Sequence, residues 1–264
     1  MKNLLIGILL FAFLISFSAC EKESFNPQTP KDAFEQMLEI FETQTEYRRV
    51  CQSQPEESNR GVVTDLSFQE IGTENQKIFG EVRDKGRNSY TVVYAEGNLA
   101  AEKTQTDTVS YLQKENAVID LHEYLAPAIQ IGAEGSDRAK NLFSPMMLEL
   151  IGEDSTLEKK EDGSFALTVP LTKYQTLQLY NSDSHTTPYS YDSRAVYTLD
   201  AQGRVTRVEH FQSNTERKTL SIEYYYGPIS LQKPEWFNKE EPLNSDIYSV
   251  KMTYEMESSC YFTL

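Results

Sequence analysis

The sequence predicts an α+β domain in which an antiparallel β-sheet packs against a few helices. An amphipathic helix pattern covers residues 30–44, and hairpin patterns cover residues 78–94 and 195–211. Residues 248–256 alternate between apolar and polar side chains, which is typical of a strand with one buried face. Hydrophobic residues make up 39% of the 264 residues, enough for a packed core. We therefore expect residues 30–264 to form a single β-rich domain.

The first 20 residues have the three parts of a secretory signal. Lys2 supplies a positive charge, an uncharged apolar run spans 4–17, and two small residues lead into Cys20. The run is shorter than the ~20 apolar residues that a membrane-spanning helix needs. The last four of these 20 residues, Phe-Ser-Ala-Cys, resemble the lipobox that lipoprotein signal peptidase recognises. We expect removal of residues 1–19 and acylation of Cys20, for instance with palmitate. The alternatives are an ordinary signal peptide, in which this cysteine is incidental, and an uncleaved anchor.

The residues after this signal predict where the protein lies. Residues 20–29 are polar and contain a proline, as expected of a short lipidated tether. The protein would then be extracytoplasmic and lipid-anchored to a bacterial membrane, in the cell envelope. The formal net charge of −15 repels nucleic acid, so we expect no nucleic-acid partner.

The cysteines allow one disulfide. Acylation would consume Cys20, which leaves Cys51 and Cys260 in a compartment where disulfides persist. We expect these two to be bridged, which would tie the start of the domain to its end. Two unrelated buried thiols are the alternative.

Local signals place the elements along the chain. Thr29 and Pro30 begin the first helix as its cap and first residue. The turns at 84–87 and 200–203 join the strands of the two hairpins. Strands are also expected within 104–121, 164–171, 174–180 and 220–226, and residues 158–162 form a solvated hairpin tip. Residues 121–131 and 137–151 have helical spacing that prolines interrupt, so short central helices are expected.

No motif identifies a reaction, and we expect a protein without enzymatic activity or cofactor. The three histidines, His122, His185 and His210, lack metal-ligand spacing, and His210 should be exposed or half-buried on a strand. Asp183 and Asp192 could bind calcium but lack the spacing of a dedicated site. Paired carboxylates for glycoside cleavage stay open, because an acidic chain offers many candidates.

The order of elements carries a resemblance. A helix follows the tether, a long antiparallel meander follows the helix, and late in the chain a strand ends in a Gly turn before a short apolar segment, Tyr224 to Trp236. This pattern over residues 30–256 resembles the half-barrel lipoproteins related to the lipoprotein carrier LolA and to mycobacterial lipid-transport lipoproteins. The resemblance implies a curved antiparallel sheet wrapped around the N-terminal helix and the short central helices, with an apolar concavity that can hold acyl chains.

Two possible functions follow from this interpretation. In the first, the apolar strand faces line a half-barrel that binds a lipid or another hydrophobic ligand through Tyr90, Val92, Tyr94, Val250, Met252 and Tyr254. Methionine and tyrosine suit such a pocket because one is flexible and the other keeps a polar tip. In the alternative, side chains fill the concavity. The protein is then a structural or glycan-binding surface lipoprotein, with aromatic platforms drawn from Tyr180, Tyr189 and Tyr191.

Overall fold

The computed structural model describes a helix-backed antiparallel sheet. It describes residues 25–53, 61–71, 73–86, 88–97, 99–106, 109–113, 142–143, 145–179, 191–212 and 215–237. Within these residues, three helices and eleven strands follow one another as α2 (Pro30–Glu42), β1 (Tyr47–Ser53), β2 (Val62–Gln69), β3 (Lys77–Asp84), β4 (Ser89–Glu96), β5 (Leu99–Thr104), β6 (Val109–Gln113), α5 (Pro145–Leu150), β7 (Thr156–Lys159), β8 (Phe165–Leu171), α6 (Lys173–Leu179), β9 (Ser193–Leu199), β10 (Val205–Gln212) and β11 (Lys218–Tyr226).

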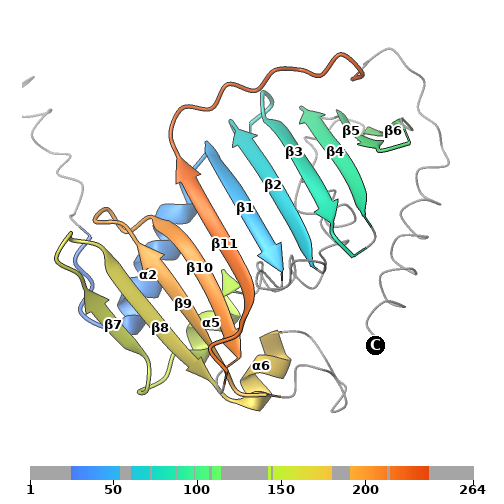
Figure 1. The fold of residues 1–264 in the computed structure, drawn as a ribbon. Helices are drawn as coiled ribbons and strands as arrows, with labels where there is room; N and C mark the ends of the chain where they lie inside the picture. Colours follow the sequence, from blue (N-terminus) through green and yellow to red (C-terminus); the bar gives the residue numbers. More distant parts are fainter. Residues whose placement is uncertain are drawn as a thin grey trace, which may run out of the picture.

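The sheet consists of two meanders joined at one seam. The strand order is β6-β5-β4-β3-β2-β1-β11-β10-β9-β8-β7, and every pair is antiparallel. The chain moves outward from β1 to β6, continues at the opposite edge with β7, and returns inward to β11 beside β1. Figure 1 shows the resulting twisted and unclosed sheet. The expected α+β class with an antiparallel, curved sheet is confirmed.

Helix α2 forms where its caps predict it. The Thr29 hydroxyl accepts a hydrogen bond from the backbone N–H of Asp32 at 3.1 Å, and Pro30 occupies the first turn. Phe34 and Met37 are fully buried on one side of the helix. The predicted amphipathic helix is therefore confirmed, ending two residues earlier than expected.

Both predicted hairpins are confirmed. Strands β3 and β4 pair across the turn at 84–89, and β9 and β10 pair across the turn at 200–203. In the second turn the N–H of Gly203 donates to the carbonyl of Asp200 at 2.9 Å, and Gly203 has a φ of 78°, which favours glycine. The expected tip at 158–162 lies at the β7–β8 hairpin, where Gly163 has a φ of 83°.

Residues 174–180 were expected to continue a strand, and that prediction is wrong. Residues 173–179 form helix α6. The cause is a capping box, because the Gln175 side chain accepts the Thr172 N–H at 2.8 Å while Thr172 Oγ1 accepts the Gln175 N–H at 3.4 Å. The expected run within 104–121 is a hairpin whose turn follows Thr104, and β6 ends at Gln113. The final strand expected at 248–256 and the helical pattern at 121–131 lie outside the described residues.

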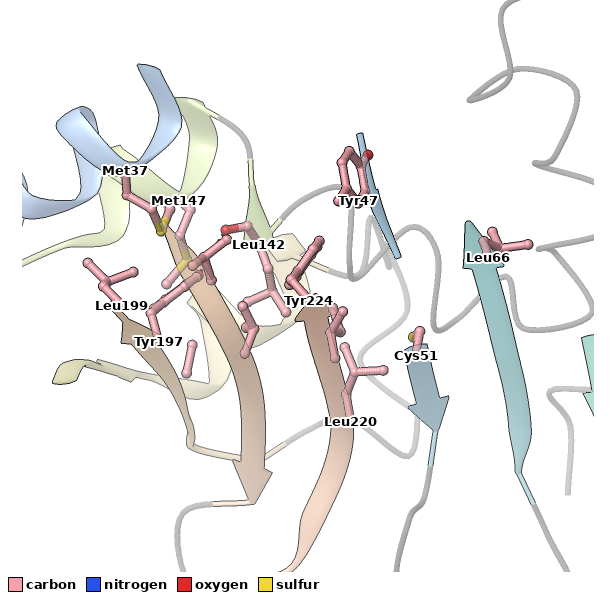
Figure 2. Close-up of a cluster of buried hydrophobic side chains, with 14 of the residues drawn as sticks. Met37, Tyr47, Cys51, Leu66, Leu142, Met147, Tyr197, Leu199, Leu220 and Tyr224 are labelled. Carbon is pink, nitrogen blue, oxygen red and sulfur yellow. Dashed lines mark hydrogen bonds between the residues drawn. The ribbon is translucent and has the colours of Figure 1, made fainter. Parts of the chain in front are cut away.

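The two faces of the sheet differ, because successive side chains of a strand point to opposite sides. The side that carries Leu66, Val93, Leu167, Tyr197 and Ile222 belongs to the main hydrophobic cluster, and we call it the core face; the opposite side is the outer face. Helices α2, α5 and α6 gather at the β7–β11 half of the sheet (Figure 1). In Figure 2, Met37 of α2 and Met147 of α5 lie over Tyr197 and Leu199, while Leu66 on β2 lies away from them.

No helix among the described residues is both long and apolar enough to span a membrane.

Candidate ligand-binding site

The core face stays apolar and buried on the strands that lie beyond the described helices. On β1 to β4 it carries Tyr47, Leu66, Ile78 and Val93, all at most 4% exposed. The register places Leu66, Gly80 and Val93 side by side in one row across β2, β3 and β4. The row is buried, so it belongs to the hydrophobic core of the domain.

Arg49 interrupts this face in the middle of β1. Its cross-strand partners are Leu66 on β2 and Tyr224 on β11. Its side chain is half-buried, and its Cζ lies 5.7 Å from the ring centroid of Phe68. The Nε atom is buried and has no hydrogen-bond partner. Within the described part of the chain, no carboxylate forms an ion pair with Arg49.

A second buried polar atom without a partner lies close by. Thr64 on β2 is 4% exposed, and its hydroxyl oxygen forms no hydrogen bond. On β1 and β2, Arg49 pairs with Leu66, and Cys51, two residues further along β1, pairs with Thr64. Arg49 and Thr64 are therefore diagonal neighbours on the same face, with their Cα atoms roughly 7–8 Å apart. Two unsatisfied polar groups therefore lie together on one apolar face.

Aromatic rings surround this position at the seam between β1 and β11. Tyr47 stacks on Phe68 with ring centroids 4.7 Å apart. The ring centroid of Phe41 on α2 lies 5.4 Å from those of both Tyr47 and Tyr224. Burial raises the pKa of Tyr47 and of Tyr224, and the positive charge of Arg49 only partly opposes this rise. Both phenols therefore stay protonated to a higher pH than an exposed tyrosine does.

The far end of the same row carries an acid. Glu102 on β5 faces Val93, four strands from Arg49, which corresponds to roughly 19 Å at the usual spacing of strands. Burial raises the pKa of Glu102 from 4.5 to about 7. At this separation Glu102 does not neutralise Arg49, and at mildly acidic pH it carries no charge.

The structure places Tyr90, Val92 and Tyr94 on the outer face, so the expectation that they face the helices is wrong. The register pairs Val93 with Gly80 and Ala95 with Ile78 on the core face, which turns the intervening residues to the other side. The alternation on β4 was recognised, but Thr91, Val93 and Ala95 point inward instead. The sequence alone could not settle this because both sets are apolar enough to be buried.

The outer-face residues have other partners. Tyr90 donates to Glu81 at 2.7 Å on the surface of the hairpin. Tyr94 is 1% exposed and packs against Phe237 with centroids 4.6 Å apart. The segment after β11 runs toward the β3–β5 end of the sheet (Figure 1) and brings Trp236 and Phe237 there. Burial, together with the charge of Glu96, raises the pKa of Tyr94 to about 12.

Several predicted site residues lie outside the described residues. These are Cys20, Cys260, Val250, Met252 and Tyr254. Cys51 is 7% exposed on the core face of β1. The lipidation of Cys20 and the Cys51–Cys260 bridge therefore stay predictions.

His210 is not exposed or half-buried as expected; it is 1% exposed beneath the sheet surface. One ring nitrogen lies 2.7 Å from the Thr219 hydroxyl and the other lies 3.0 Å from Ser193 Oγ, which in turn lies 2.7 Å from Thr176 Oγ1. Ser193 is also 1% exposed, so no substrate reaches this serine–histidine pair. The cluster satisfies buried polar groups and attaches α6 to the sheet. No group of three or more His, Cys, Asp or Glu side chains suited to a metal occurs among the described residues.

Sequence reasoning missed Arg49 and Thr64 because it missed the strands β1 and β2. Strand β2 has a readable signal, since Thr64, Leu66 and Phe68 alternate with three polar residues. Strand β1 has none, because two adjacent arginines conceal its alternation. Recognition of β2 would have indicated an antiparallel partner on its N-terminal side.

Comparison with known proteins adds no assignment. No protein-family model matches the chain, and no curated protein matches it. Among solved structures, the crystal structure of LprF from Mycobacterium bovis aligns over 78% of this chain and 96% of that chain, with 10% sequence identity and a TM-score of 0.43. A likeness this weak assigns neither a family nor a function to the chain.

Proposed function

We propose that this protein is a lipid-anchored extracytoplasmic lipoprotein that binds a hydrophobic ligand on the core face of its sheet. The observation that carries the proposal is a pair of buried polar atoms without partners, Arg49 Nε and Thr64 Oγ1, on the apolar core face of β1 and β2. An ordinary core satisfies its buried polar groups, so these atoms indicate a position for a ligand. The proposed role is binding and not catalysis.

The ligand would lie beside Arg49, the half-exposed residue in a row of buried ones. Its apolar part would run over Leu66 toward Val93 and replace protein contacts that these side chains make without it. Each methylene group moved out of water contributes about 0.8 kcal/mol, so about ten such groups suffice for micromolar binding in the absence of other costs.

Native mass spectrometry tests this function. The chain from Cys20 onward, carrying Cys20→Ser to remove the anchor, should co-purify with bound lipid or take up lipid from detergent micelles. Leu66→Asp should abolish binding in protein that keeps its circular dichroism spectrum, whereas Val92→Asp, one face away, should reduce it far less. Protein that never carries an apolar ligand, even after incubation with mixed lipids, would contradict the proposal.

The anchor is tested separately. Mass spectrometry of the membrane-bound protein should show an acylated N-terminal Cys20, and Cys20→Ser should release the protein or leave an uncleaved precursor. An unmodified Cys20 in mature membrane protein would contradict the proposed anchor without affecting the proposed binding site.

One observation favours a second candidate, binding of a glycan on the outer face. Tyr225 on β11 is 49% exposed, lies 5.5 Å from the Arg48 guanidinium, and hydrogen-bonds to Glu223. An exposed ring between charged hydrogen-bonding groups suits the flat face of a sugar. Loss of binding to an oligosaccharide array on Tyr225→Ala would establish this function, and an array without any hit would remove it.

A further inference from the structure

The first described residues of the chain pack against one end of the sheet. The ring of Phe25 lies edge-on to that of Phe165, the first residue of β8, with ring centroids 5.1 Å apart. Phe25 also packs against the main hydrophobic cluster, and Pro27, two residues later, is buried. Residues 25–29, the part of the expected tether that the structure describes, are therefore attached to the domain.

A glycine makes room for the ring of Phe25. Gly203 lies in the β9–β10 turn, and a Cβ atom at this position would lie 2.3 Å from Cδ2 and 2.6 Å from Cγ of Phe25. A side chain there would displace the ring. Phe165 pairs with Leu199, so the β7–β8 and β9–β10 turns lie at the same end of the sheet (Figure 1). We call this corner, formed by residues 25, 160–164 and 200–203, the tether end.

The packing of Phe25 limits the distance between the expected anchor and the domain. Only residues 21–24 separate Cys20 from Phe25. The five Cα–Cα steps between these two residues span at most roughly 17 Å when fully extended. Acyl chains on Cys20 would hold this residue at the level of the lipid headgroups. The tether end would then stay within about that distance of the bilayer surface.

The opposite end of the same strands lies much further from Phe25. Strands β9 and β10 are seven and eight residues long, so their other ends lie roughly 25 Å from the turn that joins them. Helix α6 lies at that end, where Thr176 Oγ1 is 2.7 Å from Ser193 Oγ (Figure 1). The formal net charge of −15 repels anionic headgroups, which favours an orientation with the body of the domain away from the bilayer.

We propose that the tether end is the surface of this protein that faces the lipid bilayer, and that Phe25, packed between Phe165 and Gly203, sets the height of the domain above the membrane. This inference rests on the proposed anchor at Cys20 and does not depend on the proposed ligand. Without the ring of Phe25, residues 25–28 would be added to the tether ahead of the α2 cap.

Energy transfer to the membrane measures this height. The acylated protein, purified from membranes, is placed in nanodiscs of phosphatidylcholine and phosphatidylglycerol that contain a rhodamine-labelled lipid. A fluorescent amino acid replaces one of two exposed residues, Gln202 in the β9–β10 turn or Tyr174 on α6. Transfer from position 202 should exceed transfer from position 174 several-fold, because transfer falls steeply with distance from the labelled lipid.

Phe25→Ala tests the role of the ring. It should reduce transfer from position 202 by roughly two-fold, since four more tether residues add up to ~13 Å of reach. Asn26→Ala is the matched control, because it truncates the neighbouring side chain, which is exposed, and should leave transfer unchanged. An insertion of about eight Gly and Ser residues after Ser24 keeps Phe25 in place and adds an r.m.s. length of roughly 15 Å, so it should also reduce transfer. Urea unfolding shows whether each variant is folded.

The outcomes separate the inference from the proposed anchor. Greater transfer from position 202, reduced by Phe25→Ala and by the insertion but not by Asn26→Ala, supports the inference. Equal transfer from both positions, or greater transfer from position 174, overturns the orientation, and unchanged transfer in Phe25→Ala overturns the role of Phe25. In these cases the protein still binds nanodiscs, so the anchor stands. Mature protein that lacks acyl chains on Cys20 and does not bind nanodiscs overturns the anchor and the inference together.

Discussion

Glu102 should make the stability of this protein depend on pH, and Glu102→Gln should remove that dependence. The carboxyl lies on the core face of β5 opposite Val93, and burial raises its pKa from 4.5 to about 7. Below pH 4.5 the group is protonated in both the folded and the unfolded chain, so it contributes no difference. As the pH rises from 4.5 to 7, the unfolded chain ionises while the folded chain holds its proton, and the folded state loses stability. Above pH 7 the whole penalty is present.

The magnitude follows from the pKa difference. Each pH unit between 4.5 and 7 is worth about 1.4 kcal/mol, so Glu102 costs roughly 3 kcal/mol of unfolding free energy above pH 7. Urea unfolding at several pH values between 4 and 9 measures this cost. The Gln variant should match the wild type near pH 4 and exceed it by up to that amount near pH 9.

A matched control separates this effect from general charge effects. Glu158 on β7 is exposed, so Glu158→Gln removes the same net charge from a solvated position. Its unfolding free energy should run parallel to that of the wild type across the pH range. A constant difference between wild type and Glu102→Gln at all pH values would refute the reasoning, because the carboxyl would then not be desolvated in the folded protein.

Four further changes test the packing and caps of the fold by urea unfolding. Gly80→Ala should cost about 1–3 kcal/mol, since its Cβ would lie 2.2 Å from Leu66 Cδ2 and 2.6 Å from a backbone carbonyl oxygen, whereas Gly152→Ala, with no atom within 4 Å, should cost none of this steric energy. Tyr197→Phe should cost about 1–3 kcal/mol, because it leaves the buried Leu142 carbonyl without the phenol that donates to it at 2.9 Å; an unchanged midpoint would contradict that bond. Thr172→Ala should cost about 1 kcal/mol through loss of the α6 cap, and Gln175→Ala should add little once Thr172 is gone. Arg49→Met should stabilise the ligand-free protein, since it removes a half-buried charge that has no ion-pair partner among the described residues, and a loss of stability would show that Arg49 has a structural role.

The elements that sequence reasoning predicted correctly have strong local signals. Thr29 and Pro30 define the start of α2, and the turn ending in Gly203 fixes the β9–β10 hairpin. These features depend on residues close together in the sequence, so they can be read without knowledge of the fold. The α6 signal was equally local, because Thr172 and Gln175 have capping-box spacing, but it lay inside an apolar run that also suits a strand.

The pairing of the two meanders could not be predicted. The contact between β1 and β11 joins residues 47–53 to residues 220–226, and it places Arg49 beside Tyr224. No local sequence pattern indicates a contact between residues that lie so far apart in the sequence. The faces of β4 were assigned wrongly for the same reason, since the identity of the buried face depends on which side the helices pack. The candidate site is therefore a product of long-range pairing, and it lies where sequence reasoning was weakest.

The location of the ligand is tested most directly by two adjacent valines on β4. Val93 points to the core face and Val92 to the outer face, so their methyl groups report on opposite sides of one strand. Nuclear Overhauser spectra of methyl-labelled protein with ¹³C-labelled oleate should show contacts from the chain to Val93 and Leu66 but none to Val92. Contacts to Val92, with Val93 silent, would place the ligand on the outer face and contradict the account.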